Sequence, residues 1–278
     1  MTQATVSGPL SAAEAAAYAA DGYVVPAFRL GEARLAALRA AVDEVIAWNP
    51  DVRPEALMSV HIADNVAEGI RGHPAFLELA LDDDILDAVA QAIGPDIVLW
   101  GCHLFCKPAG KGLEVPMHQD GHYWPIKPLA NCTVWIALDH SGPENGCLRV
   151  VPGSHRDRVL YTHRGDDSET LALDQVLNDD AVDLGAAVDV VLEPGQMSLH
   201  DIYLVHGSAP NTSGHRRAGL ALRYMPATSL FDRDFRSPRV EDALVRPDFA
   251  RRPIWLARGI DRHGGNDFEI GHAAAAAQ

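Results

Sequence analysis

A histidine and an aspartate separated by one residue, His118 and Asp120, lie in the stretch Val115–Trp124. In an extended segment, side chains two residues apart point to the same face, so a neutral imidazole nitrogen and a carboxylate oxygen can bind one metal ion. With one more distant histidine, the pair would form the 2-His-1-carboxylate site that leaves positions on Fe(II) open for a cosubstrate and O2. The spacing therefore predicts a non-haem iron centre.

The same spacing recurs at His155 and Asp157, and a chain with 13 histidines and 38 acidic residues contains such pairs by chance. A hydrogen-bonded surface contact is the commoner origin of a single pair. His155 closes a turn, Pro152–His155, and does not lie in a predicted strand. This difference favours His118 and Asp120 as the metal-binding pair.

The predicted third ligand is His206, which ends a short apolar run and precedes a glycine that lets the backbone turn close to a metal. Eleven residues later, Arg217 opens a β-rich run, Ala218–Met225. A guanidinium on the strand after the distal histidine can bind a dicarboxylate through two parallel hydrogen bonds. His200 is the competing third ligand, but Asn211 stands eleven residues after it.

The first of two regions that must position these residues is mostly helical. Ser11–Glu14 has a capping-box pattern that opens a helix to about Ala20. An apolar period of 3.6 residues predicts a second helix over 35–46, and a third spans 84–93 before Gly94.

After Pro95 the pattern changes to short strands separated by Gly and Pro turns. Thr133 and Trp135 share one face of a strand, and Glu144–Gly146 favours a tight hairpin into the strand that follows. Many short strands indicate a sandwich or jelly-roll barrel, so the fold predicted is mainly β with a helical layer. The predicted strands cover residues 97–105, 131–139, 147–151, 188–192, 197–199, 203–206 and 218–225.

Three segments, Met117–Pro125, Glu144–His155 and His206–Asn211, together resemble the phytanoyl-CoA dioxygenase family. That family comprises Fe(II)- and 2-oxoglutarate-dependent oxygenases on a double-stranded β-helix, a jelly-roll, cupin-like core. We therefore expect a single oxygenase domain over residues 1–278, with a mostly helical N-terminal part (1–95), a β-helix core (96–226) and a C-terminal extension (227–278).

The resemblance also implies roles for individual residues. It assigns Fe(II) to His118, Asp120 and His206, and the C5 carboxylate of the cosubstrate 2-oxoglutarate to Arg217, with O2 as the oxidant. Residues expected near the cosubstrate are Ser208, Trp135 and Thr133, and the candidates for lining the substrate site are His122, Tyr123, Trp124 and His103. Halogenases of the family have no carboxylate at the position of Asp120, so its presence here favours hydroxylation over halogenation. Desaturation, epoxidation or ring chemistry would use the same site and stay open as alternatives.

Composition agrees with a cytoplasmic enzyme. The formal charge of −15 comes without a basic cluster, which argues against nucleic acid and anionic membranes as partners. The four cysteines form no metal-binding pattern and are expected to be reduced and buried. No apolar run reaches the roughly 18 residues that span a membrane, and no secretory signal is visible.

The predicted substrate is a small polar metabolite similar to an amino acid, an ectoine-like solute or an aminophosphonate. An acyl-CoA is the alternative, but its phosphates need Lys or Arg, and the only lysines are Lys107, Lys111 and Lys127. Two other classes remain open. A non-catalytic cupin-like binding protein would have lost a metal ligand or the cosubstrate arginine, and a zinc hydrolase has no use for Arg217.

Overall fold

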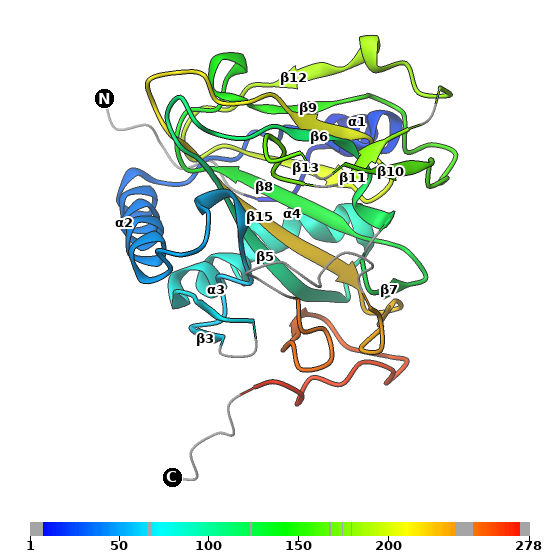
Figure 1. The fold of residues 1–278 in the computed structure, drawn as a ribbon. Coiled ribbons are helices and arrows are strands. Elements are labelled where there is room, and N and C mark those ends of the chain that lie inside the picture. Colours follow the sequence, from blue (N-terminus) through cyan, green and yellow to red (C-terminus); the bar gives the residue numbers. More distant parts are fainter. Residues whose placement is uncertain are drawn as a thin grey trace.

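The structure is a computed structural model, and it describes residues 8–65, 68–122, 124–166, 168–173, 175–178, 180–236 and 247–272. Two antiparallel sheets lie against each other, and helices cover one of them (Figure 1). The fold is therefore mainly β with a helical layer, as predicted, while the division into three parts stays a prediction. Among the described residues, no helix is both long and apolar enough to cross a membrane.

The larger sheet carries the longest strands. Its order is β1 (Tyr23–Val24), β13 (Met197–Asp201), β8 (Cys132–Ala137), β15 (Arg217–Pro226), β5 (Ile97–Lys107) and β17 (Trp255–Arg258), and β2 (Leu57–Met58) also pairs with β5. Strand β15 lies between β5 and β8 and pairs with both along most of its length. The run after the distal histidine is thus a central strand of this sheet.

The smaller sheet has the order β12 (Val188–Val190), β9 (Leu148–Val150), β14 (His206–Ser208) and β6 (Val115–His118). Trp135 and Ala221 of the large sheet pack against Leu148 and Val150 of the small one. This apolar contact holds the inner faces of the sheets together, and the two strands that carry His118 and His206 are paired within the small sheet.

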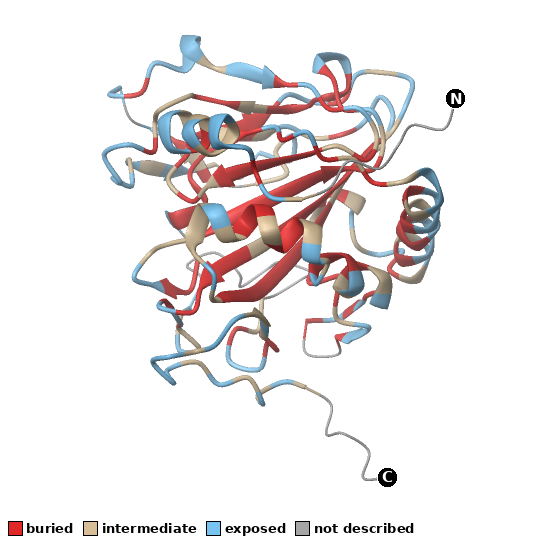
Figure 2. Cartoon of the chain, turned by 180° about the vertical axis from the view of Figure 1, so that it is seen from behind, coloured by how far each residue is buried: buried red, intermediate tan, exposed pale blue. Residues whose placement is uncertain are grey.

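Four helices cover the outer face of the large sheet: α1 (Ala12–Asp21), α2 (Glu32–Trp48), α3 (Pro74–Ala80) and α4 (Asp83–Ile93). Their buried side chains form one core with Leu104 of β5, with Leu199 of β13, and with residues at even-numbered positions of β8 and β15 such as Val134 and Leu220. Figure 2 shows the strands buried behind helices whose outer surfaces are exposed. Because strand side chains alternate, the odd-numbered positions of β8 and of β15 up to Arg223 face the small sheet.

The helix signals in the sequence are confirmed at their ends. Ser11 forms the predicted capping box with Glu14, and Gly94, at φ 93°, ends α4. The sequence analysis missed α3, which begins with a proline at its first position.

Two predictions about the strands were wrong. The turn at Glu144–Gly146 does not close a hairpin, because β9 pairs with β12 and β14 of the small sheet and not with β8. The turn instead carries the chain from one sheet to the other. In the predicted strand over residues 203–206, only His206 is in a strand, and β14 runs on to Ser208.

The remaining elements are short. They are β3 (Asp64–Asn65) with β4 (Ile70–Arg71), β7 (Ile126–Lys127) with β16 (Leu230–Phe231), β10 (His163–Gly165) with β11 (Gln175–Leu177), and the 3-10 turns η1 (Pro54–Ala56), η2 (Asp120–His122), η3 (Pro143–Asn145) and η4 (Leu184–Ala186).

Candidate metal and cosubstrate site

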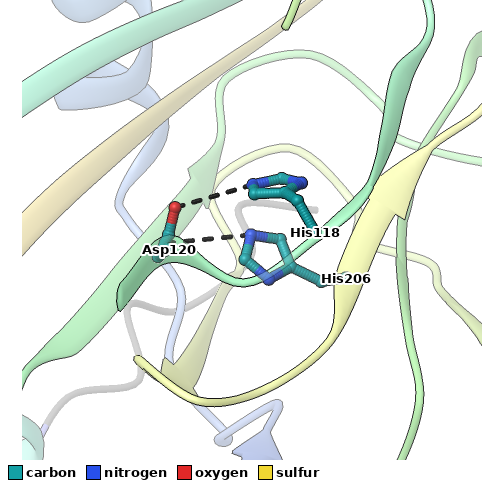
Figure 3. Close-up of side chains that lie close together, drawn as sticks. All are labelled: His118, Asp120 and His206. Atoms are coloured by element: carbon teal, nitrogen blue, oxygen red, sulfur yellow. Dashed lines mark ion pairs between the residues drawn. The ribbon is translucent and has the colours of Figure 1, made fainter. Parts of the chain in front are cut away.

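Three potential metal ligands meet between the sheets. His118 ends β6, Asp120 begins η2, and His206 begins β14. Nε2 of His118 lies 3.6 Å from Oδ1 of Asp120, and Nε2 of His206 lies 3.8 Å from Oδ2. Figure 3 shows both imidazoles directed at the one carboxylate. The ligand atoms of the three buried residues all lie within 4.8 Å of one another.

The other nitrogen of each imidazole is held by the backbone. Nδ1 of His118 lies 2.8 Å from the carbonyl of Pro116, and Nδ1 of His206 lies 2.9 Å from the carbonyl of Leu204. A carbonyl only accepts, so Nδ1 carries the proton and the lone pair is on Nε2, the atom that faces Asp120. Metal-binding histidines usually donate their second N–H in this way, so the donor set fits a metal ion.

The residue between the pair explains how the loop is held. The spacing had predicted that His118 and Asp120 share one face of a strand. They do not, because the chain turns after β6. Gln119 is fully buried, donates to the carbonyls of Val159 and Tyr203, and accepts from the N–H of Tyr161. This side chain therefore fastens the turn to two other loops, which keeps Asp120 directed at the imidazoles.

The protonation of this cluster suits metal binding. Burial, with His118 close by, lowers the pKa of His206 to about 3, so this imidazole is neutral at pH 7. Burial opposes the charged form of Asp120, but His206 and the contacts from His118 and His200 outweigh it and hold the carboxyl pKa well below its usual range. A neutral imidazole and an ionised carboxylate are the forms that bind a metal.

Next to the cluster, two basic side chains lie side by side. Arg217 at the start of β15 pairs across the sheet with Lys107 at the end of β5, and both are almost fully buried. Burial lowers the pKa of Arg217 to about 10, and burial together with Arg217 lowers the pKa of Lys107 to about 6. Like charges directly opposite each other are destabilising, so the pair favours an anion.

The surroundings of Arg217 leave its guanidinium able to bind an anion. Its Nε has no hydrogen-bond partner, and its guanidinium lies 5.2 Å from the ring centre of Trp135. The Trp135 ring lies across Gly219, where any Cβ would overlap it. Lys107 donates to the Ser208 hydroxyl over 2.7 Å, which places that side chain beside the two cations.

The cavity that joins these groups has an empty volume of about 490 Å³, part of it open to solvent. Among the predicted cosubstrate residues, Arg217, Ser208, Trp135 and Thr133 all line it. The other described residues of the lining are the three potential ligands together with Phe105, Val115, Leu148, His200, Gly207, Ala221 and Arg223.

Of the four residues predicted to line the substrate site, the three that the structure describes do not line this cavity. His122 is exposed and stacks on His163, with ring centres 4.6 Å apart. Trp124 packs edge-on against Trp100. His103 stacks on Phe105, which does reach the cavity. Tyr123 lies outside the described residues.

The two histidines considered as alternative metal ligands, His200 and His155, are not part of the cluster. His200 lines the cavity with Nε2 at 3.8 Å from Asp120, but it is not part of the cluster of three. His155 packs against Gly22 at the end of α1.

The glycine after His206 permits close approach of β6, because a Cβ on Gly207 would lie 2.8 Å from the carbonyl of Val115.

Arg223 and Phe105 were not predicted as parts of this region, and Lys107 was named only as one of the three lysines of the chain. The alternation of β15 from Arg217 places Arg223 on the same face, so that signal was present. The place of Lys107 depends on the pairing of β5 with β15, which joins residues 110 positions apart (217 − 107).

Comparisons with known proteins agree with this geometry. The family model described as "Phytanoyl-CoA dioxygenase (PhyH)" matches residues 18–219. The ectoine dioxygenase of Sphingopyxis alaskensis is 24% identical over 270 residues, which cover 91% of this chain and 85% of that protein. The human peroxisomal phytanoyl-CoA dioxygenase is 34% identical over 143 residues, covering 49% of this chain but only 41% of that protein.

Two solved structures share the fold. The non-heme monooxygenase ThoJ in its apo form has a TM-score of 0.67 and 27% identity, and the match covers 89% of this chain and 84% of that one. CytC3 with Fe(II) and α-ketoglutarate, another name for 2-oxoglutarate, has a TM-score of 0.61 and 22% identity, with 94% and 93% covered. With its family match over most of its length, this chain belongs to the phytanoyl-CoA dioxygenase family of iron- and 2-oxoglutarate-dependent dioxygenases.

Proposed function

We propose that the protein hydroxylates a C–H bond of a small polar metabolite, with His118, Asp120 and His206 binding Fe(II) between the two sheets of a double-stranded β-helix. In the balanced reaction, the substrate, O2 and 2-oxoglutarate give the hydroxylated product, succinate and CO2. Iron and the cosubstrate supply the oxidising chemistry, while the protein supplies position and exclusion of water. The observation that carries the proposal is the cluster of three ligands beside the buried cations Arg217 and Lys107.

The chain's own residues have separate tasks in this proposal. Arg217 binds the distal carboxylate of the cosubstrate through two hydrogen bonds, and Lys107 adds a second charge beside it. Ser208 and Trp135 flank that carboxylate and fix its position. The carbonyls of Pro116 and Leu204 hold both imidazoles in the metal-binding tautomer. Asp120 supplies the anionic ligand that distinguishes a hydroxylase site from one open to halide.

The size and charge of the site support a small substrate. The empty volume of about 490 Å³ includes space that is open to solvent, and the cosubstrate takes part of it. A charge of −15 disfavours a polyanion such as a CoA thioester through its long-range field. The four described cysteines are buried and free, which is in keeping with action in the reducing cytoplasm.

Two measurements test this function. Anaerobic addition of Fe(II) and 2-oxoglutarate is expected to produce the weak visible charge-transfer band of the chelate, and its absence would contradict the proposal. A screen for succinate release over amino acids, ectoine-like solutes, aminophosphonates and acyl-CoAs then addresses the substrate. Stoichiometric hydroxylation of an acyl-CoA would refute the small substrate while leaving the iron site intact.

A further inference from the structure

A second arginine lies at the other end of the cavity. Arg217 and Arg223 are both on β15 and both line the cavity. At about 3.3 Å per residue, six residues of strand separate them by roughly 20 Å along the backbone. Two arginines this far apart on one strand cannot bind the same small carboxylate group.

The potential metal ligands connect the two ends. On one side, the strand that begins with His206 continues to Ser208, which accepts a hydrogen bond from Lys107 beside Arg217. On the other side, Asp120 lies 3.8 Å from His200, whose cross-strand partner is Thr133.

Thr133 is in turn the cross-strand partner of Arg223, which brings this second arginine to the Asp120 side of the ligand cluster. A group bound at Arg223 is therefore near the metal but separate from the cosubstrate end.

The guanidinium of Arg223 rests on a rigid aromatic support. Its central carbon lies 4.8 Å from the ring centre of Trp124 and 5.8 Å from that of Trp100. The Trp100 indole donates to Asn131 over 2.8 Å, and Asn131 donates to Thr133 over 3.1 Å. Cation–π contact and these hydrogen bonds hold the guanidinium in place before a ligand arrives, which lowers the entropy cost of binding.

The described lining of the cavity carries more basic than acidic side chains. Among the described lining residues, Asp120 is the one acid, while Arg217 and Arg223 are both cationic. In the proposed function, the metal and Arg217 together hold 2-oxoglutarate, and Asp120 is a metal ligand. Arg223 is half-buried, lines the same cavity and is assigned neither of these roles.

We propose that Arg223 is the substrate-recognition residue, so that the substrate carries an oxyanion, a carboxylate or a phosphonate, which the guanidinium binds. This inference rests on the proposed function and names the substrate class of the same site. A bidentate contact at a fixed guanidinium orients the bound molecule as well as holding it, and so selects which C–H bond faces the metal.

The test uses pairs of compounds that differ only in the anionic group. The Fe(II)- and 2-oxoglutarate-loaded enzyme is assayed for stimulated succinate release with a set of amino acids and their carboxamides, and with 2-aminoethylphosphonate and its diethyl ester. We expect at least one acid to stimulate tenfold or more above its amide or ester, which lacks the anionic group. The carboxylate and phosphonate arms distinguish the two kinds of anion.

Substitutions of Arg223 then separate recognition from a purely structural role. Arg223→Gln removes a bidentate charged contact, so it is expected to raise the KM for the stimulating acid by tens of fold or more. The KM for the cosubstrate and the chelate band stay unchanged, and Arg223→Lys recovers part of the loss. Arg258→Gln is the matched control, because Arg258 lies on the same sheet and pairs with Asp83 and Asp87.

Three results would overturn the inference. They are stimulation by an amide or ester as strong as by its acid, no stimulation by any acid, and an unchanged KM for the stimulating acid in Arg223→Gln. A normal chelate band in these experiments means that the inference alone has failed. A wild-type enzyme without the band refutes the proposed function, and the inference falls with it.

Discussion

The two ends of the cavity hold the same side chain in different surroundings. Arg217 is only 3% exposed, lies beside the cation Lys107, and is walled by Trp135 and Ser208. Arg223 is half-buried and lies over the indole of Trp124, at the other end of the cavity. Both arginines stand on one strand and one face, but Arg217 pairs across the sheet with Lys107, whereas Arg223 pairs with Gly101 and Thr133.

What differs is how much freedom each site leaves its ligand. At one end, Arg217 and Lys107 are buried beside the Ser208 hydroxyl, and this arrangement suits a single dicarboxylate that does not vary. A guanidinium on a flat aromatic surface fixes one anionic group and leaves the rest of the ligand free in the cavity. A cosubstrate common to a whole family fits the first arrangement, and a substrate peculiar to one enzyme fits the second.

The largest effect is expected at the three potential metal ligands, which lie between the two ends of the cavity. Alanine at His118, Asp120 or His206 should reduce succinate formation to background and weaken Fe(II) binding, because each removes one of three protein ligands. Metal content and succinate release measure this. His155→Ala, in the other pair with the same spacing, is the control, and the result would contradict this site if that variant lost activity and His118→Ala kept it.

The next effect separates the ends. Arg217→Ala should raise the KM for the cosubstrate by a factor of tens to thousands, because a buried charged contact is worth about 2–5 kcal/mol. Arg216 faces the other side of the strand, where it bonds to Asp139 and Asp43, so Arg216→Ala should leave that KM nearly unchanged. If Arg216→Ala changes it and Arg217→Ala does not, the cosubstrate lies on the opposite face of β15.

The pH dependence sharpens the difference. Burial, then Arg217, lowers the pKa of Lys107 to about 6 in the free protein, and a bound carboxylate raises it. The affinity for the cosubstrate is then greatest below pH 6 and falls as the pH rises, by up to about tenfold per unit, because binding takes up a proton. The cosubstrate KM against pH measures this. A Lys107→Met variant should lose the slope, and an equal slope in that variant would exclude Lys107 as its source.

The smallest effects come from one glycine at each end. A Cβ at Gly219 would overlap the Trp135 ring, so Gly219→Ala should lower the free energy of unfolding by about 1–3 kcal/mol and raise the cosubstrate KM several-fold. At Gly101, a Cβ would meet Arg223 Cδ at 3.5 Å, an ordinary contact, and Gly101→Ala should change both quantities little. Equal effects would mean that the two ends are equally tightly packed.

Local sequence signals predicted the parts of this protein that neighbouring residues decide. The capping box at Ser11 and the stop at Gly94 are set by backbone groups within one helical turn, and both are present. The order and spacing of His118, Asp120, His206 and Arg217 also predicted these residues as metal ligands and cosubstrate arginine. The alternation of β15 placed Arg217 on the inner face and Arg216 on the outer one.

Only the tertiary structure decided what depends on pairing between distant strands. The sequence could not show that the turn near Glu144 changes sheets, because a turn fixes a local angle and not the partner of the next strand. For the same reason, Lys107 was not seen beside Arg217, and His122 was expected in a cavity that it does not line. Side-chain contacts across a hundred residues follow from sheet register, which the whole core selects at once.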